Sequence, residues 1–97
     1  MSNNAVSNGV MSGKKGLIMG VANERSIAWG IAAKLAEQGA ELAFTFQGDA
    51  LKKRVVPLAA SVGSDLVMPC DVTDEASMDE VFSTLSKTWG KLDFVLH

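Results

Sequence analysis

Between residues 16 and 30, a short apolar stretch is followed by a glycine, a polar loop and a helix-forming segment. Gly20 comes directly after the apolar residues 17–19, and Ser26 stands where the helix-forming segment begins. The first N–H groups of a helix, with the positive end of its dipole behind them, bind phosphate groups. A glycine lets the backbone approach such a group closely. The spacing therefore predicts a phosphate-binding turn that uses Gly20 and Ser26.

Each of these residues also has a purely structural interpretation. Gly20 could serve only as a turn residue, and Ser26 could serve only as the cap of the helix. The Gly-x-Gly-x-x-Gly fingerprint of dinucleotide sites is absent, and so is a glycine-rich loop ending in Gly-Lys-Ser or Gly-Lys-Thr. We interpret Gly30 as a small residue where the helix passes close to a sheet. Generic motifs thus leave the phosphate-binding role open.

Short apolar stretches alternate with helix-forming segments along the rest of the chain. The strands are predicted over 17–19, 42–46, 65–68 and 92–96, and the helices over 26–38, 49–62 and 74–89. Such alternation predicts right-handed crossovers and a parallel sheet covered on both faces. The fold class is α/β. We expect the first half of a Rossmann-type doubly wound fold, with strand order 3-2-1-4 and the ligand crevice where that order reverses.

The helix patterns also predict which residues are buried and where the helices are capped. In the first helix, Ile27, Ile31 and Leu35 form a stripe that alanines widen, so this face should be buried. Pro57 should kink the second helix because it lacks an N–H donor. Thr73 is the predicted cap of the third helix. The apolar face of that helix is predicted to comprise Met78, Val81, Phe82, Leu85 and Trp89.

Composition limits the class of protein. The 97 residues are 47% hydrophobic and 21% charged, which is ordinary for one globular domain, placed here at 15–97 after a mobile tail at 1–14. A net charge of −2 gives no basic surface for nucleic acid. Cys70 is the single cysteine, consistent with a reducing cytoplasm. No apolar run reaches the ~20 residues that cross a membrane. We predict a cytoplasmic protein without a nucleic-acid partner, a membrane partner or a metal site.

Several longer stretches are similar to the sequence pattern of one protein family. Residues 20–30, Gly-Val-Ala-Asn-Glu-Arg-Ser-Ile-Ala-Trp-Gly, resemble the cofactor loop of the bacterial enoyl-acyl-carrier-protein reductases, a divergent branch of the short-chain dehydrogenase/reductase family. In that branch the pattern is Gly, five residues, Ser, any residue, Ala. The similarity continues through 37–47, 63–65, 70–73 and 89–93. It covers essentially all of 15–97, and together these stretches are highly specific.

The resemblance implies roles for six residues. Gly20 and the pair Ser26 and Ile27 would hold the pyrophosphate and the neighbouring ribose, and Gln47 would lie beside the adenosine ribose. The pair Asp71 and Val72 would contact the adenine. Without the resemblance, the favoured interpretation of Gln47 is a polar strand end, and that of Asp71 is a turn and cap residue.

The end of the second strand also bears on which cofactor binds. A basic residue there selects the 2′-phosphate of NADPH, whereas a neutral or acidic one suits the ribose hydroxyls of NADH. This chain has Gln47, Gly48 and Asp49 at that point. The basic run at 52–54 comes later, on the helix, where we interpret it as a solvated face. The predicted cofactor is therefore NADH/NAD.

The resemblance further implies hydride delivery to the β-carbon of an enoyl thioester on acyl carrier protein, in fatty-acid elongation, by a homotetramer. The family's catalytic tyrosine and lysine come from a Tyr-x-x-x-x-x-x-Lys pair far downstream, and this sequence contains no tyrosine. We therefore expect an N-terminal portion that is inactive alone, and assign no catalytic residue. His97 is interpreted as incidental, and Cys70 as an inert buried thiol. Two alternatives remain: a non-catalytic nucleotide-binding module, and an ordinary short-chain dehydrogenase acting on alcohols and ketones.

Overall fold

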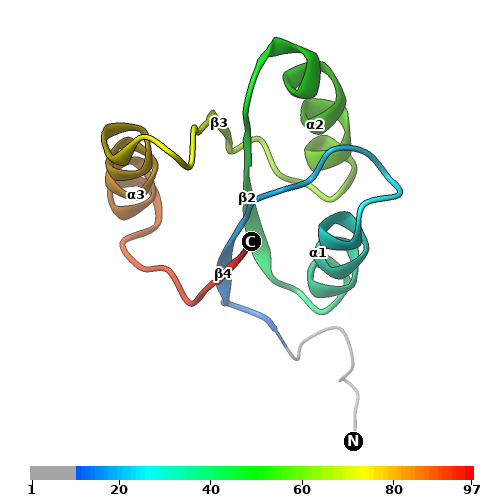
Figure 1. The fold of residues 1–97 in the computed structure, drawn as a ribbon. Helices are drawn as coiled ribbons and strands as arrows, with labels where there is room; N and C mark the ends of the chain where they lie inside the picture. Colours follow the sequence, from blue (N-terminus) through cyan, green and yellow to red (C-terminus); the bar gives the residue numbers. More distant parts are fainter. Residues whose placement is uncertain (1–10) are drawn as a thin grey trace, which may run out of the picture.

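Strands and helices alternate strictly in the computed structural model, which describes residues 11–97 (Figure 1). The strands are β1 (Lys15–Ile18), β2 (Glu41–Phe46), β3 (Val67–Pro69) and β4 (Phe94–Leu96). The helices are α1 (Ile27–Glu37), α2 (Asp49–Ser61) and α3 (Glu75–Trp89). None of the helices in residues 11–97 is long and apolar enough to cross a membrane.

All strand pairs are parallel, and the sheet order is β3-β2-β1-β4. This confirms the predicted Rossmann-type order 3-2-1-4. In the register, Ile18 of β1 lies between Phe44 of β2 and Leu96 of β4. Helices α1 and α2 cover one face of the sheet and α3 covers the other (Figure 1). The strand order therefore reverses between β1 and β4. In such sheets the ligand crevice lies at this point, outside the carboxyl ends of the strands.

Two apolar clusters result from the alternation of side chains along each strand. Ile18 and Phe44, both fully buried, pack with Ala32 of α1 and Val55 of α2. On the opposite face, β-strand residues Leu17 and Ala43 pack with α3; the helix contributes Val81 and Leu85. β2 is buried almost throughout, as the central position of a parallel strand requires.

The predicted buried stripe of α1 is only partly correct. Ala32 is fully buried and Leu35 is half-buried, but Ile27 is 83% exposed and Ile31 41% exposed. Both isoleucines lie in the first turns of the helix, where they line an open hollow at the carboxyl edge instead of packing on the sheet. Gly30 is also exposed, and a Cβ there would meet no atom within 4 Å, so its predicted packing role is wrong.

Two predictions about α3 also need correction. Its cap is Asp74, whose carboxylate accepts from the Ala76 N–H, and not Thr73. The Thr73 hydroxyl is donated to the Asp71 carboxylate, so it is unavailable for capping. Phe82, predicted on the buried face, is 38% exposed.

Pro57, predicted to kink the second helix, lies inside α2. The helix continues past it to Ser61.

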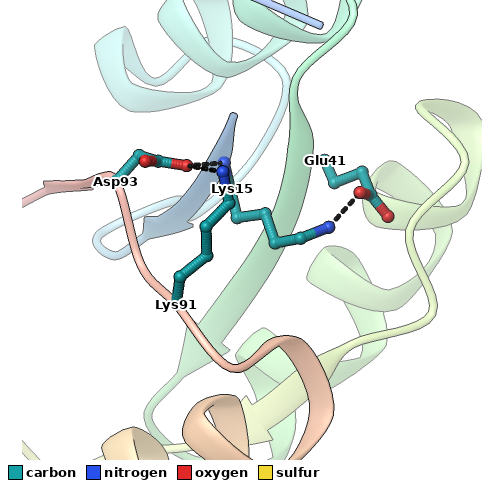
Figure 2. Close-up of polar contacts among 4 residues, drawn as sticks. All are labelled: Lys15, Glu41, Lys91 and Asp93. Carbon is teal, nitrogen blue, oxygen red and sulfur yellow. Dashed lines mark hydrogen bonds and ion pairs between the residues drawn. The ribbon is translucent and has the colours of Figure 1, made fainter. Parts of the chain in front are cut away.

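The amino edge of the sheet is held by paired charges (Figure 2). The backbone N–H of Lys15 donates to the Asp93 carboxylate at 2.8 Å, which also pairs with Lys91 at 3.2 Å. The Lys15 ammonium pairs with Glu41 and lies 5.5 Å from the Trp89 ring centroid. These contacts tie β1 to both of its neighbours.

The predicted mobile tail, 1–14, falls largely outside the described residues. Of its last four residues, Met11 donates its N–H to the Gln38 carbonyl at 2.7 Å and packs against the core under α1. Its own carbonyl accepts from the Lys14 N–H at 3.0 Å. The packed part of the chain therefore extends at least to Met11.

Candidate functional site

A first hollow lies at the carboxyl edge, over the ends of β1, β2 and β3. It is lined by Met19, Gly20, Val21, Ala22, Thr45, Phe46, Gln47, Leu51, Cys70, Val72 and His97. Three residues predicted to bind the cofactor, Gly20, Gln47 and Val72, thus come together from three separate strand ends. Ligands of open α/β sheets bind in such a position, outside the carboxyl ends of the strands.

A second hollow adjoins the first and shares Met19, Gly20 and His97 with it. Its other lining residues are Ser26, Ile27, Ala28, Ile31 and Leu96. It lies between the start of α1 and the end of β4. The shared residues make the two hollows one continuous surface, with Gly20 at the junction.

Gly20 has a backbone conformation that favours glycine. Its φ is +85°, in the left-handed region where a Cβ is strained. A Cβ built there would meet no atom within 4 Å, so the space above it is open. Close packing within the described protein therefore does not require a glycine here. The turn requires it, and the open space can admit a ligand against the backbone.

The loop between Gly20 and α1 is closed by Asn23. The Asn23 carbonyl accepts from both the N–H and the hydroxyl of Ser26, at 3.1 and 2.8 Å, and its side chain accepts from the Arg25 N–H. Ser26 occupies the N-cap position but makes no side-chain cap bond. The first N–H groups of α1 therefore keep no side-chain partner, and no acidic residue stands in its first turn.

Asp71 differs from the other predicted residues. It does not line either hollow; its carboxylate accepts from the hydroxyl and the N–H of Thr73, at 2.6 and 2.9 Å. The Thr73 hydroxyl, followed by the Thr73 N–H, holds the pKa of this carboxyl below its ordinary value. The observed contacts are those of the turn residue that the sequence left open as an alternative. Its neighbour Val72 is 47% exposed and lines the first hollow.

Sequence reasoning missed several contributors to this surface. Thr45 lies in β2 two residues before Gln47, which directly follows the strand, and both line the first hollow. The period of two along a strand could have identified Thr45 as a residue on the side of the sheet opposite Phe44. Asn23 carried no recognised motif. His97 lines both hollows, although the sequence suggested an incidental role.

The residues of this edge fit a dinucleotide. The open N–H groups at the start of α1 are donors for a pyrophosphate, and Gly20 leaves room for it. The apolar side chains of the first hollow, with Gln47 at its rim, suit a nucleoside. None of the described lysines or arginines lines either hollow. The chemistry of these residues is thus suited to a dinucleotide cofactor.

Known proteins share this sequence and this fold. A family model described as enoyl-(acyl carrier protein) reductase matches residues 20–97. An NADH-named enoyl-acyl-carrier-protein reductase of Rhizobium meliloti, number 2, is 67% identical over 93% of the chain, and FabI of Escherichia coli is 52% identical over 92%. Each of these matches covers 34% of the relative, so the chain spans about a third of their length.

A solved structure agrees with these matches. The enoyl-acyl-carrier-protein reductase of Anaplasma phagocytophilum, crystallised in complex with NAD, superposes with a TM-score of 0.86 at 55% identity, over 91% of this chain and 34% of its own. The family model alone covers well over half of the described residues. The chain belongs to the enoyl-(acyl carrier protein) reductase family.

Proposed function

We propose that this chain forms the adenosine and pyrophosphate half of an NADH site. The enzyme it serves would reduce the trans-2,3 double bond of enoyl-acyl-carrier-protein in fatty-acid elongation. The observation that carries the proposal is the start of α1: an uncapped set of N–H groups beside Gly20, at the junction of two hollows. Family membership supplies the reaction, because a fold alone does not specify one. NADH would supply the hydride, which it carries on its nicotinamide ring.

Each predicted residue has a proposed role in this half-site. Gly20 and Ser26 would hold the pyrophosphate, with Ile27 against the neighbouring ribose across the second hollow. Gln47 would accept or donate a hydrogen bond at the adenosine ribose, and Val72 would pack on the adenine. For the adenine contact of Asp71, its second carboxylate oxygen is the atom outside the bonds with Thr73.

We propose NADH in preference to NADPH. A 2′-phosphate calls for a lysine or arginine at the end of β2, where this chain has Gln47. The basic residues of α2 are exposed on the helix, and Lys52 and Lys53 line a separate surface with Val56 and Pro57. The relatives from R. meliloti and E. coli carry NADH in their names.

A homotetramer in the cytoplasm completes the proposal. Strand β4 lies at the end of the sheet and, within the described residues, pairs with β1 alone, which supports an assembly or a further strand beside it. Unpaired edges of this kind are usually covered in native proteins. Light scattering of the purified protein would measure the mass expected of four copies.

The test of the proposed reaction uses the protein expressed from the full reading frame that encodes this chain. NADH oxidation is followed by absorbance, with crotonyl-acyl-carrier-protein or with a simple ketone as substrate. Turnover of the enoyl thioester, but not of the ketone, supports the proposal. Turnover of the ketone alone would favour an ordinary short-chain dehydrogenase. NADH binding without any turnover would favour a non-catalytic module.

A further inference from the structure

Thr45 of β2 is the one buried polar side chain among residues 11–97, at 4% exposure. No hydrogen bond joins its hydroxyl to any other residue in that range. Elsewhere in the described chain, part-buried hydroxyls have partners: Ser64 donates to the Leu42 carbonyl at 2.6 Å, and Ser26 to the Asn23 carbonyl at 2.8 Å. A buried hydroxyl without a partner destabilises the folded state, so it calls for an explanation.

The place of Thr45 supplies that explanation. It lines the first hollow together with Gln47, which follows the end of β2. Its buried neighbours in that lining, Met19 and Cys70, come from the ends of the adjacent strands. The Cys70 thiol donates to the Met78 sulfur at 3.3 Å. The floor of the hollow thus combines the apolar and sulfur atoms of Met19 and Cys70 with one hydroxyl that has no hydrogen-bond partner among residues 11–97.

We propose that the Thr45 hydroxyl is a binding residue for the adenosine part of the dinucleotide. It would form a hydrogen bond to a nitrogen or hydroxyl group of that nucleoside. This inference rests on the proposed function and adds a residue to it. The adenosine half is assigned because Thr45 lines the first hollow, over β1 to β3, and not the second, beside β4. An apolar floor strengthens such a bond, since water competes less for the partners.

The proposal predicts opposite effects on stability and on binding. Thr45→Val keeps the shape and removes the hydroxyl, so it should leave the melting temperature of the ligand-free protein unchanged or raise it. The same variant should bind NADH about three- to tenfold more weakly, the loss expected for one hydrogen bond. Thr45→Ser restores the hydroxyl and should bind within about twofold of the parent protein. A hydroxyl with a merely structural role would instead lower the melting temperature when removed.

The experiment measures NADH affinity by fluorescence titration and melting temperature by calorimetry, on the protein from the full reading frame. The matched control is Thr84→Val, which removes a hydroxyl on α3 away from both hollows and should leave NADH affinity unchanged. ADP should lose affinity for Thr45→Val by the same factor as NADH. Nicotinamide mononucleotide should bind both forms equally.

Three results would overturn the proposal. The first is a Thr45→Val protein that binds NADH and ADP as tightly as the parent does. The second is a loss of affinity that accompanies a lower melting temperature and that Thr45→Ser does not rescue, which would show a structural role. The third is a parent protein that binds no NADH, which defeats the proposed function itself. The first two leave the proposed function standing, so the failures are distinguishable.

Discussion

The two edges of the one parallel sheet are built in opposite ways. At the amino edge, Lys15, Glu41, Lys91 and Asp93 pair with one another and connect β1 to its neighbours (Figure 2). At the carboxyl edge, the buried hydroxyl of Thr45 and the first N–H groups of α1 have no side-chain partner in the described chain. The contacts at the amino edge stabilise the fold, whereas the polar groups at the carboxyl edge are available to a ligand.

The starts of α1 and α3 show the same contrast on a smaller scale. Both have a residue at the N-cap that favours capping, Ser26 in α1 and Asp74 in α3. Asp74 accepts from the Ala76 N–H and has Glu75 after it, so α3 is capped and its dipole is compensated. The Ser26 hydroxyl instead donates backwards to Asn23, which leaves the start of α1 open. The N–H groups at the start of α1, beside Gly20, can therefore donate hydrogen bonds to an anion.

The largest effect is expected from placing a negative charge at the open helix start. Ser26→Glu should weaken NADH binding by about 100-fold, because a carboxylate would repel the pyrophosphate at close range. The folded protein should remain as stable, since acids are favourable at helix N-termini. Isothermal titration calorimetry measures the affinity. Ser83→Glu, the same change on the exposed side of α3, is the control and should bind NADH normally. Equal affinity in both variants would contradict the proposed cradle.

A change near the amino edge should affect stability and leave binding alone. A Cβ at Gly16 would lie 2.0 Å from Cε2 of Phe94, so Gly16→Ala forces the ring of Phe94 to move. We expect a loss of about 1–3 kcal/mol in the free energy of unfolding, measured with urea, and unchanged NADH affinity. Combining it with Phe94→Leu should recover part of the loss. A loss of affinity with normal stability would reverse the assigned roles of the two edges.

Gly30 offers a smaller change of opposite sign. It lies inside α1, exposed, with open space at its Cβ position. Gly30→Ala should therefore stabilise the protein by about 0.5–1 kcal/mol through lower backbone entropy in the unfolded chain. Thermal unfolding measures this. A decrease would mean that the helix passes too close to a neighbour for a methyl group, as the sequence alone suggested.

The smallest expected effect is a loss of stability at the amino edge when the pH is lowered. The Lys15 N–H, with help from Lys91, holds the pKa of Asp93 below its ordinary value of 3.8. A carboxyl with a lowered pKa stabilises the fold fully above that ordinary value. This contribution is lost as the pH falls from there through the lowered pKa of the folded state. In Asp93→Asn, the free energy of unfolding should therefore fall less steeply as the pH falls through that range, which circular dichroism would measure. An unchanged pH dependence would contradict the role of Asp93.

Sequence patterns predicted most of the fold because each step had a local physical cause. Apolar strands alternating with helices predicted the parallel sheet and its order. The third helix was predicted over 74–89, and α3 indeed ends at Trp89, followed by Gly90 in the left-handed conformation with a φ of +76°. The errors came from tertiary context. Ile27 and Ile31 have the spacing of a buried stripe, yet they face a hollow because the start of α1 lies at the edge of the sheet.

The site was predictable only in part, for a related reason. Strand ends placed Gly20, Gln47 and Val72 together, since parallel strands share one carboxyl edge. The open cap of Ser26 depends on the position of the Asn23 carbonyl, which no periodicity encodes. Likewise, the burial of the Thr45 hydroxyl without a partner depends on tertiary structure, because the residues that line the same hollow, such as Met19 and Cys70, follow other strands.

The most direct test of the contrast between the two edges is a titration with NADH followed by amide NMR of the protein from the full reading frame. We predict that, within residues 11–97, amide shifts concentrate at the carboxyl edge, at Gly20, Ser26, Ile27 and Thr45. The amides of Lys15, Glu41 and Asp93 should stay in place. Shifts centred on the amino edge, or saturating NADH without any shift at Gly20 and Ser26, would contradict it.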